Sequence, residues 1–307
     1  MPDCRARRNK RPALATRPMK IAYLASTVTL PDSPTRRDDY HEHVYMMEAL
    51  RPPMEARGFS LHDLAWDDPT VDWRGFDLAI IGTTWDYWDR VPEFFSGLEK
   101  IETLTQLHNP TALVKWNSRK TYLRELEAKG AKLIPTEWIE NADENAVRAA
   151  FDALQTDDLL IKRQIGAGAD GQYRLKRSDP VPAMSHPMMA QAFLPTIQSE
   201  GEYSFIFIDG DFCHCLIKRA APGDYRIQSL YGGVEEAVTP AAEDLAAAKA
   251  IISVLDDVPL YGRVDMIRGA DGNLLLMELE LIEPYLYPLE GPELGERMAA
   301  AVEKRLG

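Results

Sequence analysis

The sequence predicts an α/β protein with an open parallel sheet in its N-terminal part and an α+β arrangement in its C-terminal part. Between residues 19 and 104, apolar strands alternate with helical segments, which is the order of a parallel sheet covered by helices. After residue 158, apolar strands follow one another across short turns, as antiparallel strands do. The chain has 307 residues, of which 45% are hydrophobic, so two or three globular domains are expected.

The N-terminal part is expected to contain three strands and two helices. The strands are expected at 19–26, 59–66 and 76–82, and the helices at about 40–57 and 91–104. Gly58 ends the first helix, and Pro92 stands in the first turn of the second. Ligands of such sheets bind beyond the carboxyl ends of the strands, where Gly82–Trp88 places Trp85 and Trp88. This segment is either the lip of a pocket or an apolar corner that packs on the next domain.

The rest of the chain predicts a helix from Asn117 to Leu126, with Asn117 or Ser118 as its N-cap. Further helices are expected at 144–154, 240–254 and 292–305, and strands at 131–136, 158–162, 173–175, 188–194, 202–208, 212–217, 262–267 and 274–281. Asp209-Gly210 and the run from Gly269 to Asn273 are turn sequences. The last four strands are therefore expected to form two hairpins.

Composition excludes some classes of function. The net charge of −13 disfavours a nucleic-acid-binding protein, because phosphate backbones are bound by basic surfaces. The three cysteines, Cys4, Cys213 and Cys215, form neither a disulfide framework nor a zinc-binding pattern. No apolar run is long enough for a membrane span, so neither nucleic acid nor membrane is an expected partner.

Residues 1–18 differ from the rest of the chain in composition. They carry six basic residues and three prolines and have no apolar segment of the kind found in secretory signals. We expect a disordered basic extension, which an upstream start codon would explain, before a first strand that begins at Met19. Without a targeting signal, a cytoplasmic location is expected.

The hairpin at 262–281 carries three carboxylates, Asp265 on one strand and Glu278 and Glu280 on the other. Glu278 and Glu280 are two residues apart, so they share one face of their strand. Converging carboxylates repel one another unless cations neutralise them, and oxygen ligands of this kind suit Mg²⁺. The alternative is an exposed acidic face, which the apolar neighbours of all three residues disfavour.

The stretch from Leu159 to Gly171 places Lys162 at the end of a strand, just before a glycine-rich turn. Such a loop can offer backbone N–H groups to phosphate oxygens, and the lysine adds a positive charge. Lys120 offers a second cation near a helix start. The pattern is neither a Walker A loop nor a Rossmann fingerprint, and a flexible hairpin turn would give the same sequence.

From Lys120 to Glu280 the chain resembles the ATP-grasp fold, in its glutathione-synthetase-like and ribosomal-protein-glutamate-ligase-like branch. It resembles the cycloserine-biosynthesis cyclo-ligase group in five motifs, WNSRKTYL, LIPT, QAFLPTIQSEGEYSFIFIDG, IKRAAPGDYRIQSLYGG and RVDMI…LLMELELIEP. The resemblance extends from Met19 to the C-terminus. It implies a pre-ATP-grasp domain at 19–111, a central subdomain with the glycine-rich loop at 112–190, and a C-terminal subdomain with the metal-binding hairpin at 191–307.

The resemblance also implies a role for each residue of the matched motifs. Lys120 and Lys162 would hold the nucleotide phosphates, under a loop formed by Gly166, Gly168 and Gly171. The adenine would lie against Gln191, Ala192 and Phe193, and the ribose against Glu202. Two Mg²⁺ ions, replaceable by Mn²⁺, would bind Asp265, Glu278 and Glu280. Arg226 would stabilise the transferring phosphate or the acyl intermediate, with Arg219 and Tyr231 nearby.

Two positions depart from the family pattern. Glu280 stands where many ATP-grasp ligases have Asn, and Gly82-Thr83 stands where the cyclo-ligase group has Arg-Ser. The implied function is an ATP- and Mg²⁺-dependent carboxylate–amine ligase that acts through an acyl phosphate, between molecules or within one. A homo-oligomer is common for such enzymes. The alternative is a nucleotide-binding sensor or scaffold without turnover. A dehydrogenase is disfavoured because no Gly-x-Gly-x-x-Gly follows the first strand.

Overall fold

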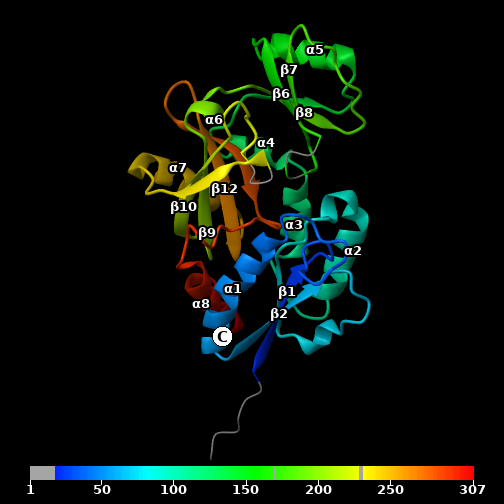
Figure 1. The fold of residues 1–307 in the computed structure, drawn as a ribbon, viewed down its shortest axis with the longest axis vertical. Coiled ribbons are helices and arrows are strands. Elements are labelled where there is room, and N and C mark those ends of the chain that lie inside the picture. The colour runs from blue at the N-terminus through cyan, green and yellow to red at the C-terminus, as the bar shows by residue number, and fades with distance from the viewer. Residues whose placement is uncertain (1–17, 167, 169–170, 228–230) are drawn as a thin grey trace, which may run out of the picture.

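The computed structural model describes residues 18–166, 168, 171–227 and 231–307, and within these ranges the strands form three sheets (Figure 1). The disordered extension predicted at 1–18 lies outside the described residues, except for Pro18. None of the helices in the described ranges has the length and apolar composition needed to cross a bilayer.

The first sheet is parallel, as predicted. It contains β1 (Met19–Ala25), β2 (Phe59–Ala65), β3 (Leu78–Ile81) and β4 (Gln106–His108) in the order β2-β1-β3-β4. The helices α1 (His41–Ala56) and α2 (Val91–Glu102) confirm the two predicted helices. The sequence did not predict β4, because it is three residues long and only Leu107 is a buried apolar residue.

The second sheet is antiparallel and lies at the far end of the molecule from the first (Figure 1). It contains β5 (Thr136–Ile139), β6 (Asp158–Arg163), β7 (Tyr173–Lys176) and β8 (Met188–Ala192), with α5 (Glu144–Ala153) packed against it. The strand predicted at 131–136 is wrong, because β5 begins only at Thr136.

The domain boundary predicted at 190/191 falls inside β8, so sheet membership favours a boundary after Ala192.

The third sheet is also antiparallel and carries both predicted hairpins. It contains β9 (Glu202–Ile208), β10 (Asp211–Arg219), β11 (Val234–Ala237), β12 (Tyr261–Arg268) and β13 (Leu274–Glu280) in the order β11-β10-β9-β12-β13. Asp209 and Gly210 both have positive φ angles, 51° and 82°, as a tight two-residue hairpin turn requires. The helices associated with this part are α6 (Thr196–Ser199), α7 (Ala242–Ser253) and α8 (Leu294–Leu306).

The C-terminal helix α8 ties the third sheet to the first. It packs against α1, and apolar residues of α1, α8, β1, β9 and β10 share one core cluster. A Cβ atom on Gly295 would lie 2.0 Å from the carbonyl oxygen of Ala49 on α1. Only glycine therefore allows the two helices to approach this closely.

The outer edge of β13 is closed by an isolated parallel bridge between Leu133 and Leu276 and by two side chains. Asn117, at the end of α3 (Thr111–Ser118), donates to the carbonyl oxygen of Leu279 and accepts from the Leu281 N–H, at 2.8 and 2.9 Å. The Tyr122 hydroxyl, at the start of α4 (Tyr122–Ala128), bonds both backbone groups of Leu279. The predicted N-cap at Asn117 or Ser118 is thus wrong, because these residues end one helix and Asn117 bonds a distant strand.

A second buried asparagine joins the first sheet to the third. Asn109, just after β4, donates to the carbonyl oxygens of Tyr261 and Leu281 and accepts from the Leu260 N–H, at 2.8 to 3.1 Å. These three bonds fix the start of β12 and the end of β13. Hydrogen bonds from Asn109 and Asn117 therefore fix the position of the hairpin that carries the acidic residues.

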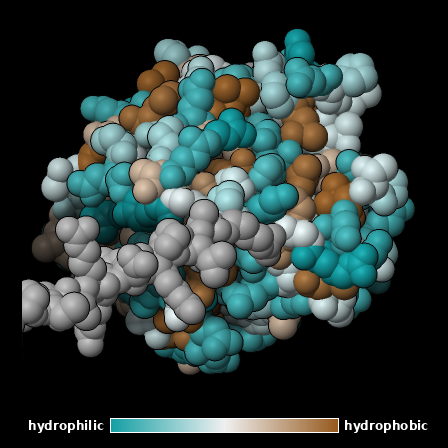
Figure 2. Space-filling model, turned by 90° about the horizontal axis from the view of Figure 1, so that it is seen from below, coloured by the Kyte–Doolittle hydropathy of each residue, from teal (hydrophilic) through white to brown (hydrophobic). Residues whose placement is uncertain are grey.

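The face of the molecule in Figure 2 is mostly hydrophilic, and its hydrophobic residues are scattered among hydrophilic ones. Among the described residues, the exposed large apolar side chains are Leu104, Val234, Val258 and Leu289. Single exposed apolar residues are ordinary on monomeric proteins. The homo-oligomer implied by the resemblance therefore stays a prediction.

We expect Asn117→Ala to lower the free energy of unfolding by about 2–4 kcal/mol, because two buried backbone groups of β13 would lose their partner. Urea denaturation measures this directly. Asn145→Ala is the matched control, since Asn145 is exposed on α5. Equal stability of the two variants would contradict the assignment of Asn117 as the lock on β13.

Candidate active site

A cavity of about 250 Å³ lies where the three sheets approach one another. Its wall is formed by the end of β6 and the glycine-rich turn, the end of β8, strands β9 to β13, and loops of the first sheet. Thirteen site residues were predicted to bind nucleotide, metal or the transferring group, together with Arg219 and Tyr231 nearby. The cavity is lined by twelve of them: Lys120, Lys162, Gly166, Gly168, Gln191, Ala192, Phe193, Glu202, Arg226, Asp265, Glu278 and Glu280.

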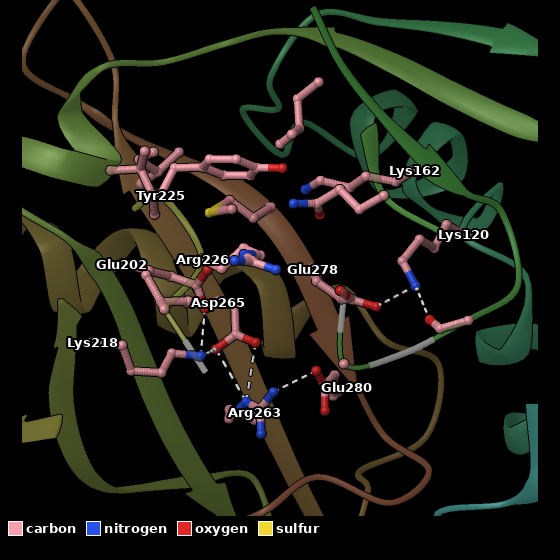
Figure 3. A pocket seen from close by; sticks show the side chains of 18 of the residues that line it. Lys120, Lys162, Glu202, Lys218, Tyr225, Arg226, Arg263, Asp265, Glu278 and Glu280 are labelled. Carbon is pink, nitrogen blue, oxygen red and sulfur yellow. Dashed lines mark hydrogen bonds and ion pairs between the residues drawn. The ribbon is translucent and has the colours of Figure 1, made fainter. Parts of the chain in front are cut away.

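Two lysines enter the cavity from one side in the view of Figure 3. Lys120 precedes α4, and its ammonium donates to the carbonyl oxygen of Gly166 and pairs with Glu278, both at 2.7 Å. Lys162, on β6, has no hydrogen-bond or ion-pair partner among the described residues. Burial lowers the pKa of Lys162, an effect that the charges of Glu278 and Glu202 oppose. A negatively charged ligand would stabilise the charged form of Lys162 and offset the effect of burial.

The glycine-rich turn lies over the Lys120 ammonium, and two of its described glycines, Gly166 and Gly168, line the cavity. Gly171 does not line it, but its position allows no side chain. Its φ is +63°, and an added Cβ would lie 2.4 Å from Nε of Arg163. Gly171 is therefore needed for the shape of the turn, while residues 167, 169 and 170 lie outside the described residues.

The end of β8 forms an apolar and amide-lined part of the wall. Gln191 is buried, and its amide nitrogen donates to the Thr136 hydroxyl at 2.9 Å. Its amide oxygen is buried and has no partner within the part of the chain that the structure describes. A buried acceptor without a donor is costly, so this atom fits a ligand that brings an N–H group. Phe193 packs edge-on against Tyr225 beside it.

A continuous row of buried ion pairs crosses four strands of the third sheet (Figure 3). Lys218 on β10 lies 2.5 Å from Glu202 on β9 and 3.4 Å from Asp265 on β12. Arg263, also on β12, lies 3.0 Å from Asp265 and pairs with Glu280 on β13. Burial opposes ionisation of Asp265, but the charges of Arg263 and Lys218 outweigh it and lower the pKa of that carboxyl.

The three predicted metal ligands differ in how many of their oxygens are already bound. Asp265 accepts bonds from Ser204, Arg263 and Lys218, which engage both of its oxygens. Glu278 and Glu280 each use one oxygen, for Lys120 and Arg263 respectively. Among the described residues, no three acidic, histidine or cysteine side chains are gathered as a metal site. Glu278 and Glu280 each keep an open oxygen that suits a cation shared with phosphate oxygens, and Asp265 stays a predicted ligand.

The glutamate at position 280 departs from the family pattern, and the structure shows what offsets its charge. Burial raises the pKa of Glu280 to about 7, and the charge of Arg263 opposes this rise. The added carboxylate therefore has its own cation in the wall.

The two predicted arginines are placed differently. Arg226 lines the cavity, pairs with Asp224 at 2.7 Å and lies 3.8 Å from the centre of the Tyr231 ring. Arg219 does not line it. Its side chain is about half exposed and pairs with Glu236 on the neighbouring strand β11. Since successive strand residues face opposite ways, it is Lys218 that faces the cavity.

The charged and aromatic wall residues that the sequence did not predict include Lys218, Arg263, Glu283 and Tyr287. A signal existed for two of them. Arg263 is two residues before Asp265 and must share its face, and Lys218 is two residues after the core residue Leu216. Glu283 and Tyr287 lie in an irregular segment after β13, where periodicity gives no direction.

The aromatic segment after β3 is a pocket wall and a packing corner at once. Trp85 and Trp88 line the cavity, which fits the first of the two interpretations. Trp85 is also buried, and its indole N–H donates to the carbonyl oxygen of Glu283 at 3.0 Å. Arg37, which follows β1 in the first sheet, lies within 6 Å of both indole rings and pairs with Asp39.

We expect Lys218→Met to destabilise the protein by about 3–5 kcal/mol, because Glu202 and Asp265 would lose a buried cation. Arg219→Met is the matched control, and its loss should stay within about 1 kcal/mol, since its ion pair is exposed. Chemical denaturation of both variants gives the comparison. A larger loss for Arg219→Met would show that the row of ion pairs does not stabilise the sheet.

Comparison with known proteins places the chain among relatives of one enzyme. Residues 21–109 match the family model described as the N-terminal domain of D-cycloserine synthetase DcsG. The cycloserine biosynthesis protein DcsG of Streptomyces lavendulae is 30% identical over 284 residues, covering 85% of this chain and 94% of that protein.

Solved structures agree with this relationship. The crystal structure of D-cycloserine synthetase DcsG superposes with a TM-score of 0.79 at 25% identity, covering 94% of this chain and all of that one. The ATP-grasp ligase PsnB, in a complex with a precursor variant, Mg and ADP, gives a TM-score of 0.63 at 16% identity, covering 95% of this chain and all of that one. The predicted ATP-grasp fold is confirmed, and the chain belongs to the family of the cycloserine biosynthesis protein DcsG, whose members are ATP-grasp ligases that form C–N bonds.

Proposed function

We propose that this ligase activates the carboxyl group of a small amino-acid-like substrate as an acyl phosphate and then joins it to an amine. One observation carries this proposal: within the described part of the chain, a single cavity contains both a free cation and open carboxylate oxygens. Lys162 has no partner among the described residues, and Glu278 and Glu280 each keep one open oxygen. A nucleoside triphosphate could bind Lys162 through a phosphate oxygen and a metal ion held by Glu278 and Glu280.

The residues of the cavity fit ATP at two separate points. The open amide oxygen of Gln191 suits the exocyclic amino group of an adenine, with Ala192 and Phe193 as neighbours. Lys162 and Lys120 suit the phosphates, beneath the turn that contains Gly166 and Gly168. Glu202 keeps one oxygen that no described residue occupies, which suits a ribose hydroxyl. The solved PsnB complex with Mg and ADP supports a nucleotide in this fold.

Glu278 and Glu280 would hold Mg²⁺, of which we propose two ions, as the resemblance implies. When bound, Mg²⁺ neutralises charge on the phosphate oxygens and polarises the γ-phosphate. Lys120 would exchange its bond with Glu278 for a phosphate oxygen. Arg226 would lie against the transferring group from the opposite wall, where its bond to Asp224 orients the guanidinium.

The proposed reaction has two steps. A substrate carboxylate oxygen attacks the γ-phosphorus, so that a new P–O bond forms, the bond to the β-phosphate oxygen breaks, and ADP leaves. The amine nitrogen then attacks the acyl carbon, so that a C–N bond forms, the C–O bond to phosphate breaks, and inorganic phosphate takes the electron pair and the proton. The chain's part is to position the reactants, to stabilise charge and to exclude water.

Incubation with ATP, Mg²⁺ and a panel of small D- and L-amino acids tests this function. We expect release of inorganic phosphate and a product lighter than its reactants by one water, and mass spectrometry distinguishes joined molecules from a closed ring. Hydroxylamine should intercept the acyl phosphate as a hydroxamate. ATP binding without phosphate release for any member of the panel would instead favour a nucleotide-binding protein without turnover.

We expect Glu278→Gln to lower the rate of phosphate release roughly 10²–10³-fold, because a neutral amide holds the cation and its phosphate poorly. Chelation of Mg²⁺ by EDTA should abolish turnover in the unmodified enzyme. Glu236→Gln, an exposed acid on β11, is the control and should remain active. Full turnover by Glu278→Gln would exclude this residue as the metal ligand.

A further inference from the structure

Glu283 is a buried carboxylate on the cavity wall for which the proposed reaction has no role. Its side chain is only 8% exposed and lines the cavity between β13 and the aromatic segment of the first sheet. No hydrogen bond or ion pair of its carboxylate is found to any residue that the structure describes. An ionised carboxylate buried in this way is costly unless a donor or a cation approaches it.

The cavity-lining acids on β9, β12 and β13 differ from Glu283 in this respect. Glu202 pairs with Lys218, Asp265 with Arg263 and Lys218, Glu278 with Lys120, and Glu280 with Arg263. Glu283 lies three residues beyond Glu280. It forms no ion pair with Lys120 or Arg263, the two cations that pair with the glutamates of β13. Since no described cation pairs with Glu283, a bound molecule could supply one.

The backbone around Glu283 is held in place. The carbonyl oxygens of Ile282, Glu283 and Tyr285 accept bonds from Tyr261, Trp85 and Arg263, at 2.8 to 3.0 Å. These donors come from the first and third sheets. The backbone that carries the Glu283 carboxylate is thus fixed by hydrogen bonds, and a binding residue needs such support to hold its position.

Glu283 lies in a different part of the cavity wall from the residues proposed to bind the nucleotide. The nucleotide groups, Gln191 and Lys162, belong to the second sheet, whereas Glu283 is bonded through its backbone to Trp85 of the first. Burial raises the pKa of Glu283 well above its usual range, and the charges of Glu280 and Glu278 add to the rise. Such a site favours a group that brings positive charge and hydrogen-bond donors, and it disfavours an anion.

We propose that Glu283 binds the amino group of the amino-acid-like substrate and so selects amine-bearing carboxylates over the matching hydroxy acids. The inference rests on the proposed function, because it assumes that a small carboxylate occupies the cavity beside the nucleotide. Trp85 and Trp88 form the apolar wall next to this amino group.

Isothermal titration of the full chain, saturated with AMP-PNP and Mg²⁺, tests the proposal. The probes are serine with glycerate and alanine with lactate, as D and L forms, since each pair differs only in the amino group. We expect the unmodified protein to bind the amine-bearing member of a pair at least about tenfold more tightly, as a charge-assisted hydrogen bond gives. Glu283→Gln should reduce this preference to about twofold or less, with unchanged affinity for AMP-PNP.

Two further variants make the result specific. Glu283→Asp keeps the charge and should retain part of the preference, while Glu290→Gln, outside the cavity on the same segment, should retain all of it. A protein that does not distinguish the members of either pair, or a Glu283→Gln variant that keeps the full preference, would overturn the inference. Failure to bind AMP-PNP would count against the proposed function instead.

Discussion

The pairing of Lys218 and Arg263 with Asp265 is the interaction on which the cavity wall depends. Together with Glu202 and Glu280 they place five charged side chains on adjacent strands of one sheet. Each charge is tolerated because an opposite charge lies within ion-pair distance, since an uncompensated buried charge would be strongly destabilising. Lys162 and Glu283, two wall groups of opposite sign, have no ion-pair partner among the described residues, and these are the groups for which a ligand is proposed.

The same constraint explains how the three sheets cooperate. On the outer side of the strand that carries Glu278 and Glu280, the described residues form only an isolated bridge at Leu276. Asn117 and Tyr122 bond the strand's backbone there, and Asn109 bonds the backbone just after it. Each of these side chains comes from the segment that links the first sheet to the second. The acidic hairpin therefore keeps its position relative to the lysines of that segment and of β6, although it is remote from both in sequence.

Much of the fold could be predicted from local patterns, and much of the site from residue types at strand ends. The parallel sheet, both hairpins and the meeting of Lys120 and Lys162 with Glu278 followed from alternation, turn residues and the resemblance. The errors arose where tertiary contacts decide. Asn117 is a residue type typical of helix caps, but it bonds a strand residue 162 positions away. Arg219 was predicted in place of Lys218, because a shift of one residue reverses the face of a strand.

The placement of the triphosphate against the charged face of β12 and β13 is the central claim, and a crystal structure with AMP-PNP and Mg²⁺ tests it most directly. The account predicts the γ-phosphate between Lys120 and Lys162, Glu278 released from Lys120 to face the cation, and the Lys218 ion pairs unchanged. Phosphates bound away from Lys162, with the bond between Lys120 and Glu278 intact, would contradict it.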